Sequence, residues 1–372
     1  MDLTGLARPP QITALPDREV VDVLIHPEHA GPPPSAALTE ALHAWEGSHY
    51  WSDEADGRHL ILTHPWSVRP IERWWLHALL LLLTMVTTTW AGAVITGRIP
   101  DPDPLWLFHE ILAPSAGALA AWASGLWFSL PLVTILLAHE LGHYLTARRY
   151  QLDVSPPYFI PVPLIPSFIG TMGAFIRLRT ILSDRRQLFD VGVAGPLAGF
   201  AVALPVLCLG LGLSHPSFDR SLHGLVLAFG GVPVAELGDS LLTLFLRRVV
   251  LGHPAAALEL HPLAFAGWVG MFVTMLNLLP ISQLDGGHIL YAATPRLQER
   301  VALGFWVLLL LLGYWWTGWF VWAGLVLVLH RGRLGHPNVL SPARPLPPSR
   351  RVVAAGALVL FLLTFTPVPF RL

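Results

Sequence analysis

Long apolar runs recur through most of this sequence. Crossing the hydrocarbon core of a bilayer takes about 20 mainly apolar helical residues. Of the 372 residues, 53% are hydrophobic and only 13% are charged, a charged share well below that of a soluble domain. The sequence therefore predicts an all-α polytopic membrane protein with about six to seven transmembrane helices. The expected spans are 75–97, 117–147, 188–213, 262–280, 301–314, 316–330 and 351–368, with a tight turn at Trp315 and Trp316 between the fifth and the sixth.

The placement of arginines predicts the orientation of these helices. If seven spans alternate, most arginines fall on one side, which should be cytoplasmic because basic loops are retained there. The arginines on this side are Arg69, Arg73, Arg148, Arg149, Arg185, Arg186, Arg296, Arg300, Arg331, Arg333, Arg350 and Arg351. The exceptions, on the other side, are Arg98, Arg220 and Arg371. The first residues lack the pattern of an export signal. We expect a multi-pass protein of the cell's inner (cytoplasmic) membrane with a cytoplasmic N-terminus.

Composition divides the chain into three parts. Residues 1–70 are polar and rich in proline and histidine, and we expect a small cytoplasmic region that is either an α/β appendage or a partly disordered arm. Residues 71–335 are expected to form the membrane-embedded domain, with its core at 117–295. Residues 336–372 are expected to form a C-terminal linker and the last transmembrane helix.

Three segments break the helical pattern. Prolines interrupt residues 155–186, so this apolar stretch is expected to be a re-entrant loop or a short β-hairpin buried against protein. Residues 98–105 are expected to form a loop for the same reason. Residues 240–252 are predicted to be an amphipathic interfacial helix, because Arg247 and Arg248 interrupt the apolar run.

Two histidines and a glutamate lie inside the second apolar run. His139, Glu140 and His143 form the pattern H-E-x-x-H in the stretch "LLAHELGHYL". Positions i and i+4 of a helix share one face, so both imidazoles can bind one zinc ion, while Glu140 reaches its water as general base. Three unpaired polar groups in hydrocarbon would be costly, which favours a functional site over a chance match.

A catalytic zinc site needs a third protein ligand and an open position for water. Asp285, in "NLLPISQLDGGH" at the end of the fourth run, is the candidate. Pro280 ends the preceding helix, and Gly286 and Gly287 let the chain turn so that the carboxylate approaches the second span. Without the histidine motif, Asp285 would be interpreted as an aspartate at the end of a helix, exposed at the water interface. His288 is expected to pack beside the site, because a fourth ligand would leave no room for water.

Charge and cysteine content exclude other classes. A net charge of −1 gives no electrostatic footprint for nucleic acid. The single cysteine, Cys208, lies in an apolar run and is expected to pack there, so neither a disulfide framework nor a thiolate metal site is predicted.

Four stretches together resemble the site-2 proteases, the intramembrane zinc metalloproteases of peptidase family M50. They are "LLAHELGHYLTARR", "GTMGAF", "GVAGPLAGF" and "HPLAFAGWVGMFVTMLNLLPISQLDGGHILY", within about 130–290. The proline-rich "FIPVPLIPSFIGTMGAF" is most similar to the chloroplast-type branch and its bacterial relatives. No PDZ-like insertion and no clear cystathionine-synthase-like module accompanies them.

The resemblance implies roles for individual residues. His139, His143 and Asp285 would bind one Zn²⁺ per chain, and Glu140 would be the catalytic acid and base. Asn277 matches a family asparagine that holds substrate or stabilises the oxyanion, although a buried asparagine can equally bond a neighbouring helix. Gly170 and Gly173 fall in a strand-forming segment that would bind substrate. Gly195 and Gly199 are explained by close helix packing.

The function expected from these residues is hydrolysis of peptide bonds in or next to transmembrane segments of membrane proteins. The expected partners are therefore a transmembrane protein substrate and the lipid bilayer. The alternative is a proteolytically inactive homologue that keeps the fold as a membrane metal-binding or scaffold protein. A zinc transporter would spread acidic and histidine sites over several spans, whereas here they concentrate in one. Substrate, regulation and oligomeric state stay open.

Overall fold

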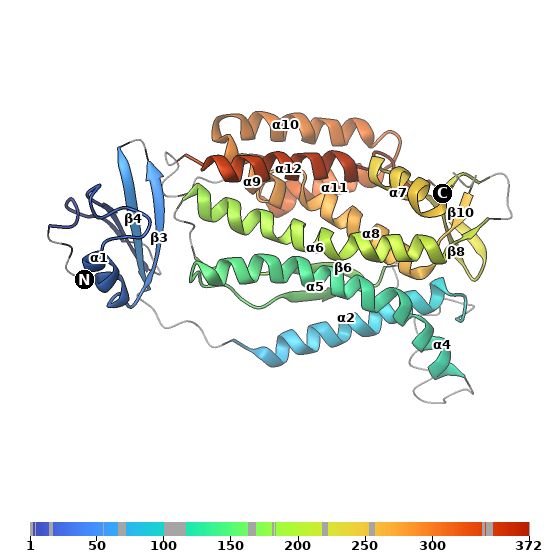
Figure 1. Cartoon of the computed structure of the whole chain (residues 1–372). Helices are drawn as coiled ribbons and strands as arrows, with labels where there is room; N and C mark the ends of the chain where they lie inside the picture. Colours follow the sequence, from blue (N-terminus) through green and yellow to red (C-terminus); the bar gives the residue numbers. More distant parts are fainter. Residues whose placement is uncertain are drawn as a thin grey trace.

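The protein is an elongated bundle of helices with a small β-sheet at each end (Figure 1). The computed structural model describes residues 3, 5–14, 18–54, 56–65, 72–99, 117–162, 169–180, 182, 184–217, 222–252, 257–336, 339 and 345–371. Most of the predicted loop at 98–105 and the centre of the proline-rich segment, 163–168, lie outside these residues.

Three long apolar helices run side by side along the bundle, with the first of them at its edge (Figure 1). They are α2 (Trp74–Ile95), α5 (Leu126–Arg149) and α6 (Arg185–Leu213), and each is long and apolar enough to cross a membrane. The second predicted span is wrong at its beginning, because the chain turns at Gly125, between α4 (Ala118–Ser124) and α5. A Cβ on Gly125 would lie 1.8 Å from the carbonyl oxygen of Thr89, so this glycine lets α2 and α5 pack closely.

Beyond the sheet residues that follow α6, the described part of the chain continues into further helices of the bundle. They are α8 (Pro262–Asn277), α9 (Asp285–Ala293), α10 (Pro295–Leu312), α11 (Gly318–Leu329) and α12 (Pro348–Thr364). The fourth predicted span stops at Asn277, and α9 is a separate short helix that the sequence analysis did not predict. The turn at Trp315 and Trp316 is confirmed, since it separates α10 from α11.

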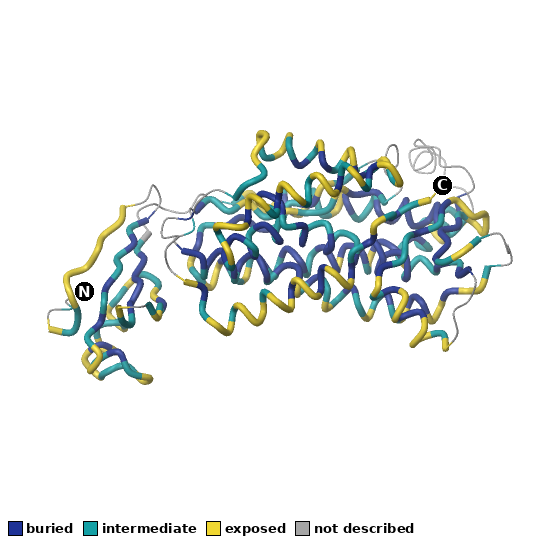
Figure 2. Tube along the Cα trace, turned by 90° about the horizontal axis from the view of Figure 1, so that it is seen from above, coloured by how far each residue is buried: buried dark blue, intermediate teal, exposed yellow. Residues whose placement is uncertain are grey.

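The outer surface of the bundle is apolar, as the surface of a membrane protein should be. Exposed residues follow the outward faces of the helices in Figure 2. They include large apolar side chains, for example Leu303 at 52%, Val321 at 72% and Val352 at 73% exposure. A face of this kind is stable in lipid and unfavourable in water. The described helices therefore agree with a membrane protein.

The N-terminal region forms an α/β unit, which is one of the two alternatives that the sequence predicts; the other is a partly disordered arm. Its four strands form an antiparallel sheet in the order β1-β2-β4-β3. The elements are β1 (Gln11–Ala14), β2 (Arg18–Leu24), α1 (Ala36–His43), β3 (Ser48–Glu54) and β4 (Gly57–Pro65). Val23, Leu38 and Leu60 are buried in its core, which joins α1 to the sheet.

The opposite end carries a five-stranded sheet that an all-α prediction misses. Its order is β11-β9-β8-β10-β7, from β7 (His215–Pro216), β8 (Gly224–Phe229), β9 (Val232–Leu237), β10 (Ala257–Glu259) and β11 (Phe370–Arg371). The overlooked signal is Gly230-Gly231 between two apolar runs, which is typical of a hairpin turn. Both glycines have positive φ.

Helix α7 (Leu241–Leu251) follows this hairpin and confirms the predicted short amphipathic helix. Its buried side carries Arg247, which forms an ion pair with Asp239 at 2.6 Å. Its outer side exposes Leu241, Leu244 and Phe245. Arg247 therefore interrupts the apolar run on the inward face, and the apolar face points out of the protein.

Candidate metal centre

Helix α5 brings both histidines of the H-E-x-x-H pattern to one place. His139 and His143 lie one helical turn apart, and their Nε2 atoms are 3.1 Å from each other. Both side chains are buried, at 5% and 7% exposure. The geometry agrees with the sequence argument that both imidazoles share one face of a helix.

The orientation of His143 is set by helix α6. Its Nδ1 donates a hydrogen bond of 2.7 Å to the main-chain carbonyl of Val191. That bond selects the tautomer whose Nε2 carries a free lone pair, and a ligand held in this way binds metal more tightly. Val191 precedes the "GVAGPLAGF" stretch, so α6 is part of the site's support.

Two glycines of α6 pack against the imidazoles themselves. A Cβ on Gly195 would lie 2.0 Å from Nε2 of His143, and one on Gly199 would lie 3.1 Å from Cβ of His139. Close packing explains both glycines, as the sequence predicts, and the groups that they accommodate are the two histidine side chains.

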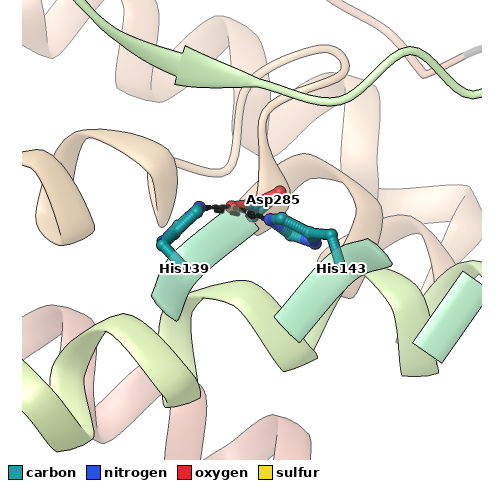
Figure 3. Close-up of side chains that lie close together, drawn as sticks. All are labelled: His139, His143 and Asp285. Carbon is teal, nitrogen blue, oxygen red and sulfur yellow. Dashed lines mark hydrogen bonds and ion pairs between the residues drawn. The ribbon is translucent and has the colours of Figure 1, made fainter. Parts of the chain in front are cut away.

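Asp285 reaches the histidines from the far end of a tight turn. Helix α8 ends at Asn277, and the chain reverses before α9 begins with Asp285. Gly286 and Gly287 make this reversal possible, because a Cβ on either would lie within 2.2 Å of a backbone oxygen of the turn. Asp285 Oδ2 then lies 3.2 Å from Nε2 of His139 and 3.3 Å from Nε2 of His143. Figure 3 shows the three side chains converging.

Glu140 and Asn277 lie beside this triad. The Glu140 side chain is buried and hydrogen-bonded to the backbone of Ile176, just beyond strand β6 (Thr171–Phe175). The side-chain amide nitrogen of Asn277 lies 3.2 Å from Nε2 of His139. All five side chains line a cavity of about 820 Å³, which is large enough for an extended peptide segment.

The two glycines predicted to bind substrate lie on the predicted hairpin, but not at the cavity wall. Strand β5 (Tyr158–Pro161) pairs with β6 in antiparallel fashion. Gly170 has φ of +81° and packs on α2, where its carbonyl accepts a hydrogen bond from Thr87 at 2.6 Å. Gly173 has open space beside it. Along β6, the cavity wall begins at Ala174.

A further residue of the cavity was not predicted at all. His336 follows α11 and its Nε2 lies 2.7 Å from Nδ1 of His288. Its ring stacks on Tyr291 at 4.6 Å. Both histidines line the cavity, on the side of Asp285. His288 thus packs beside the site as expected. Its partner His336 lies 48 residues further along the chain, and no sequence pattern predicts their contact.

The donor set fits zinc. Two imidazole Nε2 atoms and one carboxylate oxygen converge within 4.8 Å, and the cavity leaves space for a water or a substrate oxygen as a fourth ligand. Three protein ligands with an open fourth position are typical of catalytic zinc sites. The arrangement suits zinc-assisted hydrolysis with Glu140 as the proton carrier.

Comparisons with known proteins agree with this chemistry. The family model "Peptidase family M50" matches residues 127–312. The chain is 34% identical over 270 residues to "Probable zinc metalloprotease EGY1, chloroplastic" of Arabidopsis thaliana, which covers 70% of this chain and 45% of the relative. It is 35% identical over 212 residues to EGY1 of Oryza sativa subsp. japonica, covering 56% of this chain and 32% of the relative.

A third relative is "Probable zinc metalloprotease EGY2, chloroplastic" of Arabidopsis thaliana, at 32% identity over 260 residues, 66% of this chain and 42% of the relative. No solved structure matches. The chain therefore spans about a third to a half of the length of these relatives. The matched region contains all of α5 but its first residue, the turn after α8 and all four residues of the predicted metal and catalytic set, and the chain belongs to peptidase family M50.

Proposed function

We propose that this protein is an intramembrane zinc metalloprotease that hydrolyses peptide bonds in or next to transmembrane segments of membrane proteins. The observation that carries the proposal is the convergence of His139, His143 and Asp285 beside Glu140 in a cavity within an apolar helix bundle. One zinc ion per chain would be held by the two Nε2 atoms and the Asp285 carboxylate.

The reaction assigns one task to each polar side chain. A zinc ion bound by His139, His143 and Asp285 would supply a water of lowered pKa, about 7, and a Lewis acid for the scissile carbonyl. Glu140 takes the proton of the attacking water and delivers it to the leaving amine. Asn277, beside His139, is placed to donate a hydrogen bond to the carbonyl oxygen as negative charge develops on it.

Substrate would enter as an unwound strand. A helix hides its carbonyls in internal hydrogen bonds, so the scissile segment has to unfold before attack. Strand β6 offers an edge for it, because β6 pairs with β5 on one side and continues into Ile176, which contacts Glu140. Gly170 and Gly173 would shape this edge through their positive φ angles rather than by touching substrate.

The membrane topology belongs to the same proposal. Helices α8, α10, α11 and α12 lie alongside the three long helices, which supports six to seven crossings (Figure 1). Arg149, Arg186 and Arg350 line one cavity and so lie at one end of the bundle. By the positive-inside rule this end faces the cytoplasm of a multi-pass protein in the cell's inner membrane. The domain at 1–70 then lies in the cytoplasm, before the membrane domain at 71–335 and the C-terminal part at 336–372.

An inactive metal-binding homologue is the competing function. Such a protein needs no proton carrier, whereas Glu140 is present, buried and adjacent to the metal ligands. No transporter-like second site is needed to explain the polar groups described within the long helices.

The test compares wild type with Glu140→Gln on a model transmembrane substrate in proteoliposomes. We expect the variant to keep about one zinc per chain by elemental analysis, while cleavage falls by roughly 10²–10⁴-fold, the usual contribution of a general base. Equal cleavage by both proteins would overturn the mechanism. Zinc binding without cleavage by wild type on any substrate tried would favour the inactive homologue.

A further inference from the structure

A second cavity lies where the N-terminal sheet meets the end of the helix bundle. It has a volume of about 590 Å³ and is bounded by strand β3, the end of α5, the start of α6 and the start of α12. It shares no lining residue with the metal centre. Nothing in the proposed proteolysis uses it.

The walls of this cavity carry more positive than negative charge. Among the described residues that line it, Arg149, Arg186 and Arg350 face a single carboxylate, Asp190. Arg350 neutralises this carboxylate with two parallel hydrogen bonds of 2.7 Å, from Nε to Oδ1 and from Nη2 to Oδ2. No described carboxylate of the cavity lining remains to balance the charges of Arg149 and Arg186.

The Arg186 side chain is fixed by contacts with strand β3, and its guanidinium keeps a hydrogen-bond donor without an acceptor among the described residues. Its Nη1 donates to the main-chain carbonyl of Trp51, and its guanidinium lies 5.7 Å from the ring centroid of Tyr50. Its Nε is buried and makes no hydrogen bond to any part of the chain that the structure describes. A buried donor without a partner is costly unless a ligand supplies the acceptor. An arginine fork fixed in this way suits the oxygens of a phosphate.

Arg149 supplies a second free charge from the last turn of α5. It is exposed, and none of the described residues pairs with it. The neighbouring Arg148 instead lies over the ring of Tyr144 at 6.0 Å and does not line the cavity. Two adjacent arginines of the same helix turn therefore differ in what they face.

An apolar surface adjoins the charged cavity on the membrane side. Val353 of α12 lines the cavity and is 39% exposed. Val193 of α6 also lines it, and Leu197, one turn further into the bundle, is 41% exposed. A ligand with a phosphate at one end and a hydrocarbon chain at the other matches this pair of surfaces.

We propose that this cavity binds the phosphate of an anionic phospholipid, with Arg149 and Arg186 as its ligands and the acyl chains lying along α6 and α12. Because β3 forms one wall, the bound headgroup joins the N-terminal sheet to the membrane body. The site would make the attachment of that domain depend on the lipid around it.

The proposal is tested by native mass spectrometry of full-length protein in detergent, titrated separately with phosphatidylglycerol and phosphatidylcholine. We expect retained phosphatidylglycerol and at least roughly tenfold weaker phosphatidylcholine binding. Arg149→Gln and Arg186→Gln should each weaken phosphatidylglycerol binding by about tenfold or more, as the loss of a charge-assisted contact implies. Arg148→Gln is the matched control and should change nothing.

A competition experiment with a water-soluble phosphate distinguishes a lipid headgroup from a free phosphate as the ligand. Glycerol phosphate at millimolar concentration should fail to displace the lipid, because it lacks the acyl chains. Displacement at this concentration would overturn the assignment to lipid. Equal binding of both lipids, or unchanged binding in Arg149→Gln, would overturn the site itself. Arg149 is exposed, so this variant tests the proposal even if Arg186→Gln fails to fold.

Discussion

At the scale of single residues, the metal centre depends on two glycines of α6 as well as on the side chains that would bind the metal. Gly195 leaves the space that the His143 imidazole occupies, and Gly199 does the same for His139. Spacing within one helix predicted the two histidines. The contact between glycine and imidazole depends on the register in which α5 and α6 cross, and no local pattern encodes that register.

Gly195→Ala is expected to weaken zinc binding. The added Cβ would lie 2.0 Å from Nε2 of His143, so the imidazole must move from its position between the Val191 carbonyl and Asp285. Loss of ligand orientation usually lowers metal affinity by roughly 10–100-fold. Competition with a chelator measures it. Gly304→Ala on α10 is the control, because nothing lies within 4 Å of its Cβ position. Equal affinities in both variants would contradict the prediction.

His59 should make the N-terminal sheet sensitive to pH. Burial lowers the pKa of His59, but hydrogen bonds to Asp22 and Asp56 raise it by more, so the net shift is upward. Its Nδ1 lies 2.8 Å from Asp22 and its Nε2 lies 3.1 Å from Asp56, which suits an imidazolium that donates twice. A raised folded pKa gives stability that is complete below the unfolded value of about 6.5 and is lost as pH rises through the folded value.

Hydrogen exchange of the β2 and β4 amides, corrected for intrinsic rates, measures this effect. Protection in wild type should fall as pH rises from 6 to 9, relative to His59→Gln, whose protection should not follow the histidine titration. Parallel profiles for the two proteins would contradict the assignment of charge to His59.

At the scale of elements, the proline-rich segment shows what a sequence pattern can and cannot predict. Broken helicity predicted a re-entrant loop or a short β-hairpin near the site, and β5 and β6 form the hairpin. The ends of the helices were less predictable. The sequence predicts that Pro280 ends the helix, whereas α8 already ends at Asn277, and the turn over 278–284 carries Asp285 to the histidines of α5.

Met172→Pro tests whether β6 receives the substrate strand. Met172 is 63% exposed, and the pairing of β5 with β6 skips it between Thr171 and Ala174. No β5 residue is the register partner of Met172, and proline in its place removes the amide that a substrate strand on the other edge of β6 would need. We expect cleavage to fall about tenfold, the cost of one backbone hydrogen bond of about 1–1.5 kcal/mol. Met172→Ala should cleave like wild type, and equal loss in both would point to the side chain instead.

Helix α7 should lie in the membrane interface. Its exposed side carries Leu241, Leu244 and Phe245, while Arg247 is paired inside with Asp239. A spin label at position 245, in a Cys208→Ala background, should be more accessible to oxygen than to a water-soluble nickel reagent. The reverse ratio would show that this face meets water.

At the scale of the molecule, the N-terminal sheet is attached by polar contacts to the loop that leads from the hairpin to α6. The Tyr50 hydroxyl donates to Asp184 at 2.6 Å, and Arg18 donates to Thr180 at 2.8 Å. Asp184 also caps α6 through the amide of Gln187. Composition predicted a separate region at 1–70, but these contacts join positions more than 100 residues apart and have no local signature.

Tyr50→Phe should loosen this attachment without unfolding the protein. It removes one hydrogen bond, of about 1 kcal/mol, and leaves the cap of α6 intact. Spin labels at positions 46 and 300, in a Cys208→Ala background, should give a broader distance distribution in this variant. Tyr144→Phe is the control, and an equally broad distribution there would exclude the Tyr50 contact as the cause.

The sheet at the opposite end has a consequence for self-association. Strand β11 covers β9 only at Glu236 and Leu237, and no other strand among the described residues pairs with the rest of that border. Val232 is 66% exposed there, and an apolar open border invites strands from other molecules. Pro233 lies within this stretch and has no amide hydrogen to offer. Pro233 thus opposes edge-to-edge aggregation along this border of β9, because an incoming strand finds no amide hydrogen there.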